Sequence, residues 1–213
     1  MLDIRPVAGA LGAEIHGLDL CGDIGTEDFL RIRKLLNEYQ VIFFRDQQIS
    51  PANMKALALS FGPVQTHPAY ETVPDYPEIT ILESTAEKPT RIEAWHTDMT
   101  FRQHPPMATM LKSDISPARG GDTLWSSMTA AYDALSFHMQ KFLEELHAIH
   151  DFSWGFKESL AEPGGKERLA DAVAANPPVR HPVVRTHPET GKKGLFGNSL
   201  VTTHLEGLRP AES

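Results

Sequence analysis

The spacing of apolar residues in the N-terminal part of the chain predicts strands and helices in turn. Residues 4–20 alternate between apolar and small side chains, which is typical of two short strands joined by a turn. Residues 40–44 form an apolar run of strand length. Between them, Thr26 caps a helix whose apolar face consists of Phe29, Ile32, Leu35 and Leu36. A second helix follows Ser50 and Pro51, because serine caps a helix and proline fits its first position.

The rest of the chain predicts further strands with helices inserted between them. Strands are expected at residues 79–82, around His96, and at 107–112, 123–126, 182–185 and 195–196. Two helical segments are expected within 127–149 and another at 164–175. This order of elements favours a β-sandwich or a jelly roll, so the predicted fold class is mainly β with inserted helices.

Composition narrows the class of protein. The length of 213 residues suits one domain with a sizeable core. The net charge of -8 comes without a basic stripe, so nucleic acid is not an expected partner. No apolar run is long enough to cross a membrane. Cys21 is the single cysteine, which excludes an internal disulfide and indicates a reducing, cytoplasmic location.

The sequence His96-Thr97-Asp98 carries the most specific chemistry. On a strand, residues two apart point to the same face, so His96 and Asp98 could bind one metal ion. An imidazole and a carboxylate are two of the three ligands in the triad that holds Fe(II) in oxygenases. A zinc hydrolase could use the same pair, but the chain has neither a His-Glu-x-x-His motif nor a cysteine pair. A buried histidine bonded to a carboxylate is the structural alternative.

Seven sequence blocks in order carry a family resemblance. They are VIFFRDQ at 41–47, HPAY at 67–70, WHTDMTF at 95–101, GGDTLW at 120–125, AYDAL at 131–135, HDF at 150–152 and HPVVRTHP at 181–188. With these blocks the chain resembles the taurine dioxygenase branch of the Fe(II)- and 2-oxoglutarate-dependent dioxygenases, the TauD/TfdA family. The resemblance implies a double-stranded β-helix, or jelly roll.

The resemblance also implies roles for individual residues. His96 and Asp98 would be the first two iron ligands, and Thr123 would bond a carboxylate of the cosubstrate 2-oxoglutarate. In the taurine branch a histidine and a tyrosine of the HPxY block contact the sulfonate. The residues expected to bind substrate are therefore His67 and Tyr70, together with the aromatic side chain of Phe156.

The resemblance implies further parts that we do not find in the chain. In the family, a second iron-binding histidine and an arginine that pairs with 2-oxoglutarate follow well beyond the His-x-Asp motif. We expect residues 1–213 to form a single domain, a jelly roll incomplete at the C-terminus that lacks these two residues. Open sheet edges and a two-ligand site would leave such a chain poorly stable and inactive.

The function implied is oxidation of a small organic acid with iron, 2-oxoglutarate and O2. A sulfonate such as taurine is the first expected substrate, with release of an aldehyde, sulfite, succinate and CO2. Ile92 and Val201 depart from the taurine pattern, so an alkyl sulfate or an aryloxy carboxylate stays open. A truncated family member that acts as a binding module is the non-enzymatic alternative. Assembly into a homo-oligomer also stays open.

Overall fold

The computed structural model of the chain describes residues 2–87, 89 and 94–213. Within that part, helices hold more residues than strands, and the strands form small separate sheets. The expected mixture of strands with inserted helices is therefore confirmed, whereas a mainly β composition is not. Ile92, one of the two residues that depart from the taurine pattern, lies outside the described residues.

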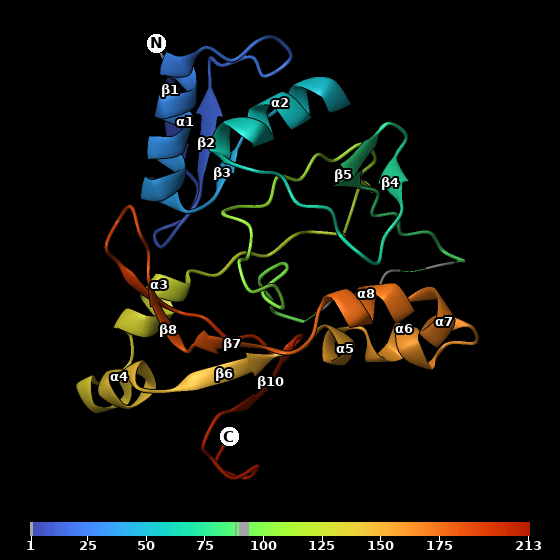
Figure 1. Cartoon of the computed structure of the whole chain (residues 1–213). Helices are drawn as coiled ribbons and strands as arrows, with labels where there is room; N and C mark the ends of the chain where they lie inside the picture. Colours follow the sequence, from blue (N-terminus) through green and yellow to red (C-terminus); the bar gives the residue numbers. More distant parts are fainter. Residues whose placement is uncertain (1, 88, 90–93) are drawn as a thin grey trace.

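The N-terminal half is a three-stranded sheet with two helices beside it (Figure 1). Its strands are β1 (Asp3–Pro6), β2 (Ala13–His16) and β3 (Ile42–Phe43), and β2 pairs antiparallel with β1 and parallel with β3. The helices are α1 (Thr26–Tyr39) and α2 (Pro51–Phe61). These elements confirm the predictions for this region. One detail was wrong, since Gly25 rather than Thr26 occupies the N-cap of α1.

Apolar side chains hold this half together. Ile32 and Leu35 of α1 are buried, as the helical spacing predicted, and Leu57 of α2 packs into the same cluster as Ile32. The side chain of Ser50 caps α2 by accepting a hydrogen bond from the backbone of Asn53 at 3.1 Å. The buried face explains why α1 forms where the pattern placed it, and the cap and the buried face together explain α2.

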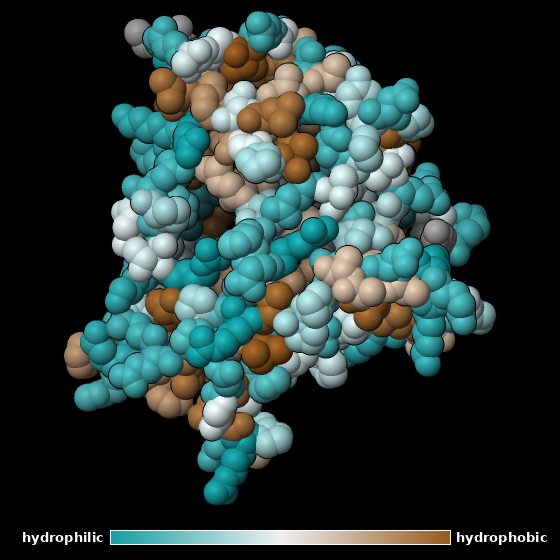
Figure 2. All heavy atoms as spheres, in the orientation of Figure 1, coloured by the Kyte–Doolittle hydropathy of each residue, from teal (hydrophilic) through white to brown (hydrophobic). Residues whose placement is uncertain are grey.

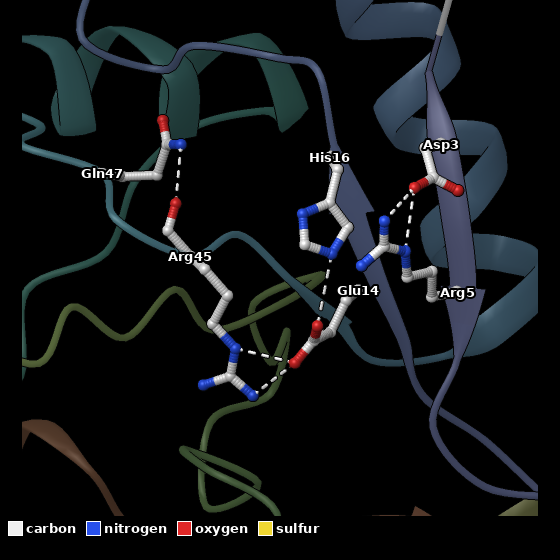
Figure 3. Close-up of polar contacts among 6 residues, drawn as sticks. All are labelled: Asp3, Arg5, Glu14, His16, Arg45 and Gln47. Carbon is white, nitrogen blue, oxygen red and sulfur yellow. Dashed lines mark hydrogen bonds and ion pairs between the residues drawn. The ribbon is translucent and has the colours of Figure 1, made fainter.

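Two polar residues of the sequence block at 41–47, Arg45 and Gln47, form hydrogen bonds in the turn after β3 (Figure 3). The Nε and Nη2 atoms of Arg45 donate to Glu14 Oε1 on β2 at 2.8 and 2.7 Å. The Oε1 atom of Gln47 accepts from the backbone of Leu20 at 2.7 Å, and its Nε2 donates to the carbonyl of Arg45 at 3.0 Å. These contacts fasten the turn to β2 and to the loop before α1, so we assign the block a structural role.

The C-terminal half is built on a second three-stranded sheet. Its central strand β6 (His147–His150) pairs antiparallel with β7 (Val179–Pro182) and with β10 (Thr202–Leu205). Four short helices follow β6 and lie beside one another in Figure 1: α5 (Phe152–Gly155), α6 (Lys157–Ala161), α7 (Gly165–Arg168) and α8 (Ala170–Ala175). The single helix expected at 164–175 is therefore two helices, α7 and α8.

The remaining elements are small. Two hairpins, β4–β5 and β8–β9, pair antiparallel, and two helices, α3 and α4, precede β6. Their bounds are β4 (Thr72–Val73), β5 (Tyr76–Thr80), β8 (Val184–Thr186), β9 (Lys193–Leu195), α3 (Met128–Asp133) and α4 (Phe137–Glu144). The two helical segments predicted within 127–149 are confirmed.

Three expected strands are absent, and this corrects the sequence analysis. Residues 94–98, 107–112 and 123–126 form no strand in the described part of the chain. A strand is stabilised by its neighbours, and none of the described sheets places a partner beside these segments. Large apolar side chains of the same region are exposed, among them Ile115 at 94% and Leu124 at 71%.

A further apolar cluster includes residues of α5 and α8. Phe101, Phe152, Leu169, Ala172 and Val201 are buried together. Val201, which departs from the taurine pattern, is therefore a core residue. The hydropathy surface shows apolar side chains, in brown, between hydrophilic ones at several places on one face (Figure 2).

Among the helices that are described, none has the length and apolar character needed to cross a membrane.

Candidate functional site

The three residues predicted to bind substrate form one aromatic cluster. The ring centroids of His67 and Tyr70 lie 4.5 Å apart, and Phe156 lies 5.7 Å from His67 and 5.9 Å from Tyr70. Phe101 lies 6.1 Å from His67, and Phe152 stacks on Phe156 at 4.5 Å. The fold thus joins the loop after α2 to the end of α5, although these segments are far apart in the sequence.

The backbone around His67 fixes the proton on its ring. The backbone N–H of Ala69 donates to His67 Nδ1 at 3.2 Å, so a neutral imidazole carries its proton on Nε2. Burial lowers the pKa of His67 to about 4, against the raising effect of Asp98. Near pH 7 His67 is therefore neutral and presents one N–H donor. Burial also raises the pKa of Tyr70, which keeps its hydroxyl protonated as a second donor.

His96 and Asp98 face each other even though no strand carries them. The Nε2 atom of His96 lies 3.2 Å from Asp98 Oδ1, and Nδ1 of His96 donates to the carbonyl of Ala94 at 2.8 Å. The hydrogen bond with Asp98 raises the pKa of His96, and the same bond lowers the pKa of Asp98. A turn at residues 98–100 replaces the expected strand and still brings the pair together.

The pair fits a metal ion in chemistry and spacing. Two ligand atoms bound at right angles to one ion, each about 2.1 Å away, lie about 3 Å apart, close to the separation of Nε2 and Oδ1. The bond from His96 Nδ1 to a carbonyl is the support that metal-binding histidines commonly have. Within the described residues, no group of three His, Cys, Asp or Glu side chains could hold a metal. The described part thus offers two candidate ligands, His96 and Asp98.

The aromatic cluster and the pair are neighbours. Asp98 raises the pKa of both His67 and Tyr70 by its negative charge, and the charge of His67 in turn lowers the pKa of Asp98. Such mutual effects require short separations, because charges interact weakly across long distances in water. Five of the six predicted site residues therefore belong to one place in the fold.

Thr123 is the exception. Its side chain is exposed, and its segment has no strand partner in the described sheets. The structure does not bring Thr123 to the His96–Asp98 pair, and its contact with 2-oxoglutarate stays a prediction.

The structure adds two residues that sequence reasoning missed. The side chain of Thr109 lies close enough to Asp98 to lower the pKa of that carboxyl, as His96 does more strongly. Arg102 donates from Nη2 to the carbonyl of Thr66 at 3.1 Å, and its charge lowers the pKa of His67. Thr109 lies in the exposed segment after the motif, where no sequence signal singles it out. Arg102 directly follows the WHTDMTF block, and that adjacency was the available signal.

The family model for the taurine catabolism dioxygenase TauD, TfdA family matches residues 3–213. The chain belongs to the TauD/TfdA family. A crystal structure of a taurine dioxygenase from Burkholderia xenovorans superposes on this TauD/TfdA chain with a TM-score of 0.79 at 30% sequence identity. The superposition covers 100% of this chain and 68% of that one. This chain, with its small sheets, therefore shares the fold of that taurine dioxygenase.

Two curated relatives act on sulfur-containing esters by name. An alkylsulfatase from Acinetobacter baylyi is 36% identical over 201 residues, which is 92% of this chain and 62% of the relative. An alpha-ketoglutarate-dependent sulfate ester dioxygenase from Pseudomonas putida is 32% identical over 100% of this chain and 71% of its own length. This TauD/TfdA chain therefore spans roughly two thirds of the length of these relatives.

Proposed function

We propose that this protein is an Fe(II)- and 2-oxoglutarate-dependent dioxygenase that hydroxylates a small organic acid. The observation that carries the proposal is the His96–Asp98 pair, with its ligand atoms 3.2 Å apart beside the cluster of His67, Tyr70 and Phe156. Membership of the TauD/TfdA family supports the reaction class, and the name of the relative from Pseudomonas putida supports 2-oxoglutarate as cosubstrate.

Each residue has a role in this proposal. His96 and Asp98 would hold the iron, and Thr123 would bond 2-oxoglutarate. Iron and 2-oxoglutarate, when bound, supply the oxidising chemistry for hydroxylating a C–H bond with O2. His67 and Tyr70 donate hydrogen bonds to the anionic head of the substrate, and Phe156 packs against its carbon chain. The aromatic side chains also exclude water from the reacting carbon.

We propose a sulfate ester or a sulfonate as the substrate. Both head groups carry three terminal oxygens that accept hydrogen bonds, which suits the N–H of His67 and the O–H of Tyr70. The names of the two curated relatives favour an alkyl sulfate over taurine, and an aryloxy carboxylate is a further candidate. Hydroxylation of the carbon next to the sulfur group yields an aldehyde with sulfate or sulfite, so the product anion tells the first two apart.

A binding module is the second candidate function. One observation favours it. Among the described residues, no third His, Cys, Asp or Glu side chain joins His96 and Asp98 in a group that could hold a metal. Such a protein would bind the organic acid at His67 and Tyr70 without consuming 2-oxoglutarate. It would also bind iron weakly, because two protein ligands hold a metal ion less tightly than three.

An anaerobic titration with Fe(II) and 2-oxoglutarate tests the proposal. We expect the weak visible charge-transfer band of the chelate, lost in His96→Ala and kept in His138→Ala, a matched change at an exposed histidine of α4. Equal bands in the protein and in His96→Ala would overturn the assigned metal site. Bleaching of the band by O2 and an alkyl sulfate, with release of sulfate, would identify the reaction and its substrate class.

A further inference from the structure

A buried hydrogen-bond network lies directly behind the candidate metal ligands. Thr100, two residues after Asp98, is 1% exposed, and its hydroxyl lies 3.0 Å from Nδ1 of the fully buried His150. Asn198 Nδ2 donates to the same hydroxyl at 3.2 Å. Neither His150 nor Asn198 has a role in the reaction proposed above, so the network needs an explanation of its own.

The hydrogen bonds of this network pair both nitrogens of the His150 ring. Its Nδ1 lies 3.0 Å from the hydroxyl of Thr100, and its Nε2 lies 3.3 Å from the hydroxyl of Thr202. The hydroxyl of Thr100 also accepts from Asn198. The ring is therefore held from both sides by side chains of the same network.

The far end of the network is also satisfied. The Oδ1 atom of Asn198 accepts from the backbones of Leu200 and Val201, each at 3.1 Å. The backbone of Asn198 donates to the hydroxyl of Thr202 at 3.0 Å. A buried polar network whose members are all paired is rigid and selects one arrangement of the chain. Thr100 is the member of this network that lies on the ligand turn.

The backbone between Asp98 and Thr100 is strained. Met99 has φ 53°, a left-handed conformation that non-glycine residues seldom adopt. Such strain persists only where the surroundings hold it in place. Here Thr100 and Phe101 are buried on one side, and His181 Nε2 donates to the carbonyl of Arg102 at 2.9 Å. The anchored residues 100–102 thus hold the turn that presents Asp98 to His96.

We propose that Thr100 and His150 are positioning residues, which act through the strained turn at Met99 to hold Asp98 in its metal-binding position. The proposal rests on the metal site proposed above. Neither residue touches the metal or the substrate. Supporting residues of this kind commonly change metal affinity by 10- to 100-fold when they are removed.

Two substitutions at Thr100 separate the hydroxyl from the shape of the side chain. Thr100→Val keeps the volume and removes the hydroxyl, whereas Thr100→Ser keeps the hydroxyl. Thr203→Val is the matched control, because Thr203 lies on β10 and its hydroxyl donates to Ile149 of the same sheet at 3.2 Å, without contact to Thr100. His150→Leu and His150→Asn repeat the comparison from the other end if Thr100→Val does not fold.

The measurements are Mn(II) affinity and amide hydrogen exchange of residues 98–102 without metal. In Thr100→Val we expect Mn(II) binding about tenfold weaker and exchange at least about tenfold faster, both restored by Thr100→Ser and unchanged in Thr203→Val. Mn(II) affinity and exchange equal to those of the unmodified protein would overturn the proposal. If the unmodified protein binds Mn(II) no better than His96→Ala does, the metal site fails, and hydrogen exchange still decides whether the network holds the turn.

Discussion

His67 and Asp98 lie close enough that each shifts the pKa of the other. Asp98 raises the pKa of His67, and His67 lowers that of Asp98, although burial dominates at His67 and holds its pKa at about 4. A neutral donor for an oxyanion thus lies beside a carboxylate suited to a cation. In the proposed site, His67 would therefore face the head group of the substrate while Asp98 binds the metal.

Acid should destabilise the protein through its buried histidines. Burial lowers the pKa of both His67 and His150 from 6.5 to about 4, so below pH 6.5 the unfolded chain binds protons that the folded chain does not. The free energy of unfolding therefore falls as the pH falls from 7 to 5. His96 opposes this trend, since its pKa is raised in the folded state.

Urea unfolding at several pH values between 7 and 5 measures the effect. That window lies above the titration of Glu144 and Glu189, whose ion pairs hold their pKa values at about 2. In His67→Gln we expect a shallower dependence of the urea midpoint on pH, whatever happens to the midpoint itself. A midpoint that rises as the pH falls would contradict the assignment of neutral buried histidines.

Removing the donor of His67 should weaken substrate binding. We expect His67→Leu to raise KM for an alkyl sulfate at least about tenfold, because a hydrogen bond to a charged group contributes about 1.5–3 kcal/mol. The control is His187→Leu. The Nδ1 atom of His187 accepts from the backbone of Glu189 at 3.3 Å, a local contact like that of His67 with Ala69, on the β8–β9 turn. Equal KM values in both variants would remove His67 from the substrate site.

At Met99, substitution by valine should destabilise the protein more than substitution by asparagine. Valine is strongly disfavoured at positive φ because its side chain branches at Cβ, whereas asparagine tolerates this conformation. We expect Met99→Val to be less stable than Met99→Asn by at least about 1 kcal/mol, although valine is the more apolar residue. Thermal or urea unfolding of the two variants checks this, and the reverse order would show that Met99 serves mainly in packing.

Two adjacent glycines at the start of α7, Gly164 and Gly165, should respond differently to substitution by alanine. A Cβ on Gly165 would overlap the carbonyl oxygen of Ser159, so Gly165→Ala forces the backbone apart and should cost about 3 kcal/mol. A Cβ on Gly164 meets nothing within 4 Å, and there the cost comes from φ +73°, about 1–2 kcal/mol. Asparagine should therefore rescue position 164 and fail at position 165. Equal losses of unfolding free energy at both positions would contradict this distinction.

Local patterns in the sequence determined much of the N-terminal half. Helix α1 follows from the spacing of Ile32 and Leu35, and α2 follows from the cap at Ser50, because both signals depend on near neighbours in the chain. The pairing of His96 with Asp98 could also be predicted from the sequence, since only Thr97 separates the two residues in the motif. The reasoning from a strand was wrong, because a turn provides the same proximity.

The tertiary structure decided what depends on distant segments. No local signal connects Thr100 with His150, or His67 with Phe156, since these contacts form only when β6 and α5 pack behind the ligand turn. The absent strands at 107–112 and 123–126 have the same cause, because a strand needs a hydrogen-bonding partner that its own residues cannot supply. The sequence alone determined which residues could do chemistry, and packing between distant segments decided which of them meet.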